Sequence, residues 1–138
     1  MSTRSNIGII NRNGSVETIY CHSDGYPSYN GAILLEHYSN EDKLRELLAL
    51  GDISSLGAEV GEKHSFDDYE LAQANNWTRV YGRDRGEKGT KVRKYPNVSL
   101  AANAMEEYLY LWDCKTNSWI FSDHGDGFKP LTPASCKE

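Results

Sequence analysis

The sequence predicts an α+β fold in which an antiparallel sheet, built from an N-terminal and a C-terminal hairpin, packs against three to four short helices. A hairpin pattern lies near each end of the chain, helical patterns lie between them, and no linker-like segment separates them. The 138 residues are about the size of one domain, long enough to bury a core without metal or disulfide staples. We therefore expect a single domain over residues 1–138.

The N-terminal hairpin is predicted by two apolar, β-branched runs, 6–10 and 16–20, that flank Asn13-Gly14. Asn-Gly is a strong hairpin signal because both residues tolerate positive φ. With Asn13-Gly14 as a two-residue loop, Arg12 faces Ser15. In this register the likelier core face carries Ile7, Ile9, Val16 and Tyr20, with His22 at the end of the strand.

Helical patterns occupy the middle of the chain. The segment 29–38 is apolar at its centre, and Pro27 limits how far it extends toward the N-terminus. Ser39 is the expected N-cap of the next helix, which has a leucine stripe at helical spacing and a C-capping glycine at Gly51. The remaining expected elements are helices at 65–75 and 99–106, a strand at 78–81 and a charged loop at 82–89.

The C-terminal hairpin is predicted by the runs 108–112 and 119–121 around a polar turn at 114–117; residues 123–138 read mostly as loop. If Asp113 faces Ser118, one side is aromatic and carries Tyr108, Tyr110, Trp112, Trp119 and Phe121. The opposite side is also apolar, so both need cover. Because Tyr and Trp are favoured at interfaces, the aromatic side is a candidate partner or homodimer surface. The alternative is that a helix or the C-terminal tail covers it.

Composition limits the classes of partner and the compartment. A net charge of -5 disfavours non-specific nucleic-acid binding and permits an acidic surface offered to a basic partner. No apolar run approaches the roughly 20 residues of a membrane helix, and the polar start lacks a secretory pattern. We expect a protein that does not enter a membrane and resides in the cytoplasm, that of the host cell if a phage encodes it. Cys21, Cys114 and Cys136 are expected to be free thiols.

The segment His22–Pro27 is the first candidate site. On a strand end, His22 and Asp24 point the same way and could bind a ligand, or transfer a proton with His22 as base and Asp24 orienting it. The structural interpretation is a rigid turn in which Asp24 caps the turn and Gly25 takes positive φ. Two ligands do not make a metal site, so we expect no metal and no cofactor.

The loop Gly82–Gly86 is the second candidate, because Arg83 and Arg85 suit a bidentate grip on phosphate or carboxylate. The alternative is a solvated loop whose charge Asp84 and Glu87 balance. If this loop converges with the His22–Pro27 turn, Arg83 and Arg85 complete an anion site to which Tyr26 adds a hydrogen bond or a stacking ring.

Four segments of the first 57 residues share a recognisable pattern: the opening residues 1–8, Tyr20–Pro27, Leu34–Tyr38 and Leu50–Leu56. Together they resemble a family of uncharacterised small bacteriophage and bacterial proteins marked by His-x-Asp-Gly-Tyr-Pro after an N-terminal hairpin. The resemblance covers about residues 1–57, with looser similarity at Arg83–Gly86. It implies a phage or mobile-element accessory protein and supplies no reaction.

Three functions follow from these observations. The first is a non-catalytic binding or inhibitory protein that acts on a host macromolecule, in host takeover or anti-defence. The second is a phosphate- or nucleotide-binding protein that uses His22, Arg83 and Arg85. The third is a hydrolase or transferase that uses His22 and Asp24. We rank them in this order, and so expect a binding protein rather than an enzyme.

Overall fold

The computed structural model describes residues 2–137 and confirms the α+β class. Its strands are β1 (Ser5–Ile10), β2 (Val16–Cys21), β3 (Ile53–Ser55), β4 (Arg79–Val80), β5 (Arg93–Tyr95), β6 (Tyr108–Asp113), β7 (Ser118–Asp123) and β8 (Phe128–Pro130). Its helices are a π-helical turn η1 (Pro27–Gly31), α1 (Ala32–His37), α2 (Glu41–Ala49), α3 (Tyr69–Asn75), α4 (Tyr81–Arg85), α5 (Val98–Asn103) and a 3-10 turn η2 (Ser135–Lys137). The short strands β3, β5 and β8 and the helix α4 were not expected from the sequence.

The strands form one mixed sheet rather than the antiparallel sheet expected. Their order is β4-β3-β2-β1-β6-β7-β8, with β5 paired to β2 as well. Each hairpin is antiparallel, but the two hairpins join through their first strands, β1 and β6, which run in the same direction. The β2–β3 pair is also parallel. The sheet is mixed because the chain passes through the helical middle between the two hairpins.

The turn of the N-terminal hairpin is one residue longer than expected. Ile10 pairs with Val16, and the backbone N–H of Asn11 donates to Ser15 O at 2.8 Å. The loop therefore comprises residues 12–14, with Gly14 at φ +90° in the position that a G1 bulge requires.

This shift corrects the expected core face, because a slip of one residue moves side chains to the other side of a sheet. Ile7 and Ile9 stay on the core side, now joined by Ile19 and Cys21. Val16 packs on the opposite side. Tyr20 is only half-buried and pairs with Asn6.

The C-terminal hairpin has the expected register, with Asp113 paired to Ser118 and Trp112 to Trp119. Its aromatic side is not a free partner surface, however. Tyr110, Trp112, Trp119 and Phe121 are all at most 4% exposed, and only Tyr108 is half-buried. The four belong to the main core with leucines of α1 and α2 and with Leu131 of the C-terminal segment. Helices and the C-terminal segment cover this side of the hairpin, as in the alternative interpretation.

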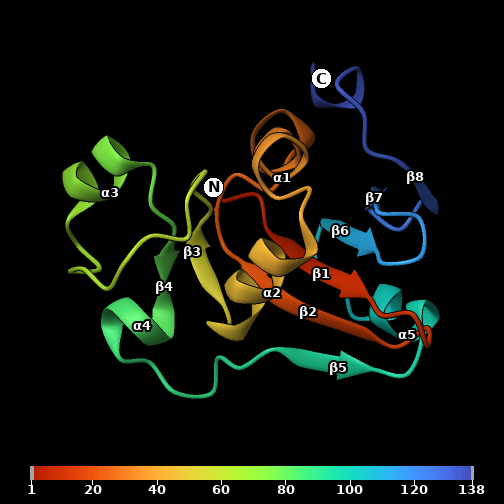
Figure 1. Cartoon of the computed structure of the whole chain (residues 1–138), viewed down its shortest axis with the longest axis horizontal. Helices are drawn as coiled ribbons and strands as arrows, with labels where there is room; N and C mark the ends of the chain where they lie inside the picture. Colours follow the sequence, from red (N-terminus) through yellow and green to blue (C-terminus); the bar gives the residue numbers. More distant parts are fainter. Residues whose placement is uncertain (1, 138) are drawn as a thin grey trace.

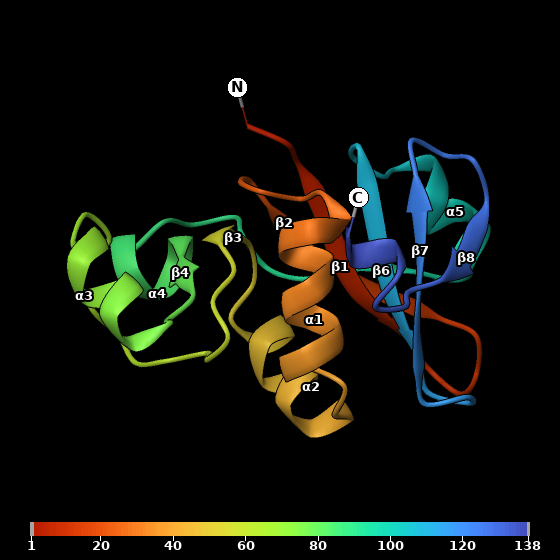
Figure 2. The same cartoon turned by 90° about the horizontal axis from the view of Figure 1, so that it is seen from above.

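A second, smaller core lies on the other side of the sheet, where Val16, Leu109 and Leu111 pack against Ala101 of α5. Figures 1 and 2 place α3, α4 and β4 at one end of the molecule, and β7, β8 and α5 at the other. Among residues 2–137, no helix combines the length and apolar character that crossing a membrane requires.

Candidate functional site

The His22–Pro27 segment forms a tightly held turn. Its positive φ falls on Asp24 (+57°) and not on Gly25 as expected. Gly25 is needed for a different reason, because a Cβ there would lie 2.8 Å from the Cβ of Ser5. The Gly25 N–H donates to Thr3 O at 2.8 Å, and Tyr110 Oη donates to Gly25 O at 2.6 Å. These contacts match the structural interpretation of the segment.

His22 and Asp24 do not form a proton-transfer pair. His22 Nδ1 lies 2.8 Å from Tyr20 Oη, whereas Tyr26 Oη donates to Asp24 Oδ1 at 3.2 Å. The structure gives the two side chains no hydrogen bond to each other in residues 2–137. The arrangement that a His-Asp base requires is therefore not formed.

Cys21 lies buried behind this turn and serves the fold. Its thiol donates to Ser23 O and accepts from Asn30 Nδ2 at 3.3 Å. Burial raises the pKa of Cys21 to about 11, so the nucleophilic thiolate is scarce at neutral pH. Cys21, Cys114 and Cys136 are all free thiols, as expected.

We expect a thiol reagent at pH 7.5 to label Cys136 first, because Cys136 is half-buried whereas Cys21 and Cys114 are buried. Mass spectrometry of the folded protein over time measures the order, and the same reaction in urea is the control that exposes all three thiols. Rapid labelling of Cys21 in the folded protein would contradict its structural role.

Arg83 is fully engaged inside the protein. Its Nε and Nη2 donate to Asp84 at 2.9 and 3.1 Å, and Nη2 also donates to Thr78 O at 2.9 Å. Its Nη1 donates to Val60 O at 3.0 Å and to Gly61 O at 3.1 Å. These bonds account for all five N–H groups of a guanidinium, so Arg83 has none left for a ligand.

Arg85 also has its charge paired within the protein. It is exposed, forms an ion pair with Glu87, and places its guanidinium carbon 4.5 Å from the Phe66 ring centre. Neither Arg83 nor Arg85 lines the cleft that Asp24 borders, and His22 does not line it either. The structure therefore does not bring the four residues of the expected shared site together in this cleft.

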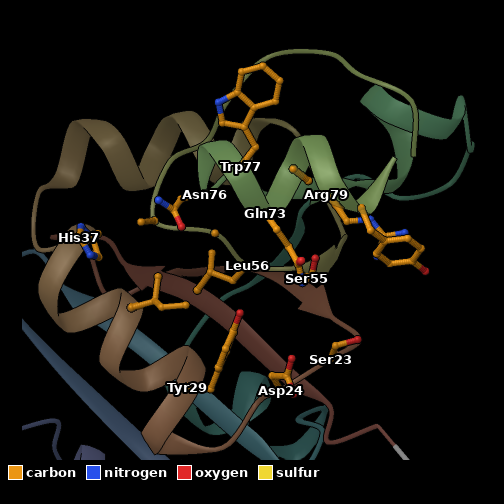
Figure 3. A pocket seen from close by; sticks show the side chains of 15 residues that line it. Ser23, Asp24, Tyr29, His37, Ser55, Leu56, Gln73, Asn76, Trp77 and Arg79 are labelled. Atoms are coloured by element: carbon orange, nitrogen blue, oxygen red, sulfur yellow. The ribbon is translucent and has the colours of Figure 1, made fainter. Parts of the chain in front are cut away.

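Asp24 instead borders a different cleft, of about 450 Å³, between α1 and α3 (Figure 3). One wall comes from the turn, η1 and α1, the floor from β3 and the residues after it, and the other wall from α3 and β4. Its polar lining includes Ser23, Asp24, Ser55, Gln73, Asn76 and Arg79. A cleft of this size can take a small ligand or a side chain of a partner.

Two exposed tyrosines stand on opposite walls of the cleft. Tyr29, from η1, is 41% exposed, and Tyr69, from α3, is 56% exposed. Burial, followed by the charge of Asp24, raises the pKa of Tyr29, so its hydroxyl stays protonated at neutral pH. Tyrosines offer large contact area and a hydrogen bond at little entropic cost.

The floor of the cleft depends on close backbone packing at Gly57. A Cβ on Gly57 would lie 2.3 Å from Asn76 O and 2.6 Å from the Trp77 carbonyl carbon. Tyr38, which directly follows α1, donates its Oη–H to Gly57 O at 2.8 Å. Thr78 Oγ1 accepts from the Gly57 N–H at 3.0 Å. This segment therefore joins the α3 end of the molecule to the main core.

Arg79 supplies the positive charge of the cleft. It is 8% exposed, and its Nε and Nη2 both donate to Phe66 O, at 3.0 and 2.8 Å. Its guanidinium carbon lies 4.3 Å from the Phe66 ring centre and 3.9 Å from that of Tyr69. No carboxylate of residues 2–137 forms an ion pair with it.

Sequence reasoning missed Arg79 because a single arginine in a short strand carries no motif. The one usable signal was its position between Thr78 and Val80 in an expected strand, where a charged residue needs a partner. Within residues 2–137, no three His, Cys, Asp or Glu side chains are placed to hold a metal ion.

Comparisons with protein-family models, with curated proteins and with solved structures found no match to this chain. The resemblance to phage proteins stays a prediction.

Proposed function

We propose that this protein is a non-catalytic binding protein that holds a partner macromolecule at the cleft between α1 and α3. The observation that carries the proposal is the pair of exposed tyrosines, Tyr29 and Tyr69, on facing walls of a polar cleft. Tyrosine and arginine are the side chains over-represented at the energetic centres of protein interfaces, and Arg79 lies in the same cleft.

The separation of His22 from Asp24 favours binding over catalysis at this place, because each side chain already has a tyrosine partner. The cleft also lies on the side of the molecule opposite to α5, away from the covered aromatic hairpin. With the resemblance to phage proteins, the proposal extends to an accessory protein that inhibits a host macromolecule in host takeover or anti-defence.

We expect the double variant Tyr29→Ser/Tyr69→Ser to lose the partner that the wild-type protein captures from a bacterial lysate. Both rings are exposed, so their loss removes contact area without opening the core. Removing a hot-spot ring costs about 2 kcal/mol or more of binding free energy, which is about a thirtyfold loss of affinity for each of the two rings. Quantitative mass spectrometry of the captured proteins measures the effect.

Leu100→Ser is the matched control, because Leu100 is 45% exposed on α5, at the other end of the molecule. Tyr29→Phe/Tyr69→Phe should keep most of the capture, since it preserves the rings. A partner that the double serine variant retains, or that Leu100→Ser loses equally, would contradict the proposal.

A further inference from the structure

We propose that the Arg79 end of the cleft binds one anionic group, a carboxylate or a phosphate, through the free edge of the Arg79 guanidinium. The inference rests on the proposed function in that it names the group which a partner presents to the cleft. It is tested with small anions alone, so it can fail or succeed independently of the partner.

Arg79 is a buried charge without a counter-ion in the described residues. Arg79 is more than nine-tenths buried, yet no acidic side chain of residues 2–137 pairs with it. The three other arginines in residues 79–95 all have ion pairs: Arg83 with Asp84, Arg85 with Glu87 and Arg93 with Asp52. Buried charges in proteins are normally paired, so Arg79 lacks the partner that its neighbours have.

The Arg79 guanidinium uses only part of its N–H donors within the protein. Phe66 O accepts from Nε and Nη2, which occupies the edge of the guanidinium between these two nitrogens. Nη1 has no acceptor in residues 2–137, and Nη2 has a second N–H. The edge between Nη1 and Nη2 is therefore free, and it is a fork that carboxylates and phosphates bind with two parallel hydrogen bonds.

This fork is held in a fixed position. The rings of Phe66 and Tyr69 contact the guanidinium, and the double hydrogen bond to Phe66 O fixes its plane. A ligand would find an arginine that has already lost its conformational freedom. Preorganised donors bind more tightly than mobile surface lysines, because less side-chain entropy is lost on binding.

Polar side chains surround this end of the cleft. Gln73 reaches from α3 toward Ser55 of β3, on the wall that also carries Arg79 (Figure 3). Neither side chain has a hydrogen-bond partner in residues 2–137, so both have donors to offer. The remaining ionisable side chains that line the cleft are Asp24 and His37. The Asp24 carboxylate disfavours an anion beside it, so the anion is expected at the Arg79 end of the cleft.

The test is an NMR titration of the folded, full-length protein with sodium phosphate and, separately, with sodium acetate, both against sodium chloride at equal ionic strength. We expect saturable shifts of the Gly57 and Asn76 amides and of the Gln73 side-chain amide, because these three residues line the cleft. Saturation by phosphate alone assigns the site to phosphate groups, and saturation by acetate assigns it to carboxylates. Shifts with neither anion beyond the chloride control would overturn the inference.

Gln73→Glu is the decisive variant, because it adds a negative charge to the cleft from an exposed helix position that the fold does not need. It should weaken anion binding about tenfold. Ala74→Glu, one residue further along α3 and outside the cleft lining, adds the same charge and should change binding by less than about twofold. Equal effects of both variants would overturn the site.

Arg79→Lys is a second variant, which keeps the charge and removes the fork; we expect weaker anion binding and a lower melting temperature.

The anion site and the proposed function can be tested separately. Anion binding without a tyrosine-dependent partner leaves this inference standing and contradicts the proposed function. A tyrosine-dependent partner without anion binding does the reverse.

Discussion

Replacing Arg83 with methionine is expected to lower the free energy of unfolding by about 3–5 kcal/mol, one of the largest effects of a single change in this chain. Methionine keeps much of the aliphatic volume but removes all five donors. The Asp84 side chain, which is fully buried, would then be left without its counter-ion. The carbonyls of Val60, Gly61 and Thr78 would lose their donors as well. Urea unfolding followed by circular dichroism measures the loss.

Arg85→Met is the matched control, two residues further along the chain. The Arg85–Glu87 pair is exposed, and exposed ion pairs contribute at most about 1 kcal/mol. If Arg83→Met lowered the free energy of unfolding as little as Arg85→Met, Arg83 would not stabilise the fold as its hydrogen bonds indicate. Its guanidinium would then again be a candidate for ligand binding.

The same pair predicts a pH dependence. Burial raises the pKa of Asp84, but hydrogen bonds from Arg83, from the Val80 N–H and from the His64 N–H outweigh it and leave the pKa lowered. A carboxyl with a lowered pKa in the folded state stabilises the fold above its unfolded pKa, about 3.9, and loses this contribution as the pH falls through the folded pKa. The difference in unfolding free energy between wild type and Arg83→Met should therefore be largest at pH 7 and become smaller below about pH 4. A difference that grows in acid would contradict the ion pair.

Trp112→Ala is expected to lower the free energy of unfolding by about 3–5 kcal/mol, because it leaves a large cavity in the main core. Trp112 is 4% exposed, and its ring meets that of Trp119 edge to face with centroids 5.7 Å apart. The cavity would open between the hairpin and the leucines of α2. Thermal unfolding and urea titration measure the loss.

Two comparisons separate this core role from the partner-surface role that the sequence allows as a candidate. Trp112→Phe should recover part of the lost stability, since it refills part of the cavity. Sedimentation of the folded variants should give the association state of the wild type. Full stability of Trp112→Ala together with a changed association state would restore the aromatic hairpin as an interface.

The fold class and most helix positions could be predicted because their signals are local. The α2 stripe of Leu44, Leu47 and Leu48 is buried as its spacing requires. The cap differs by one residue, because Asn40 rather than Ser39 accepts the N–H of Lys43. The polar turn of the second hairpin gave the correct register. The first hairpin did not, because Asn13-Gly14 is compatible with both a two-residue and a three-residue loop.

The candidate site could be predicted only in part, for two reasons: the register of the first hairpin differs from the expected one, and the sequence does not show which arginine has free donors. The one-residue shift in the first hairpin moved His22 with Tyr20 to the other side of the strand, where the two side chains meet. Asp24 borders a cleft, but His22, Arg83 and Arg85 do not line it. The arginine in that cleft is Arg79 and not Arg83, and pattern alone does not tell an arginine enclosed by its own chain from one with a free edge.

The central position of β1 has a consequence for how the chain reaches its native state. The backbone groups on one edge of β1 pair with β2, which follows within a few residues, whereas those on the other edge pair with β6, which is synthesised much later. Asn6 Oδ1 accepts from the Glu106 N–H across 100 residues of sequence. During synthesis on the ribosome, the first hairpin therefore emerges with a bare, apolar strand edge long before its partner exists, and such edges invite pairing with other chains. Contacts this distant in sequence are formed late, so the closure of β1 against β6 should set the folding rate and mark the interval in which the nascent chain most needs a chaperone.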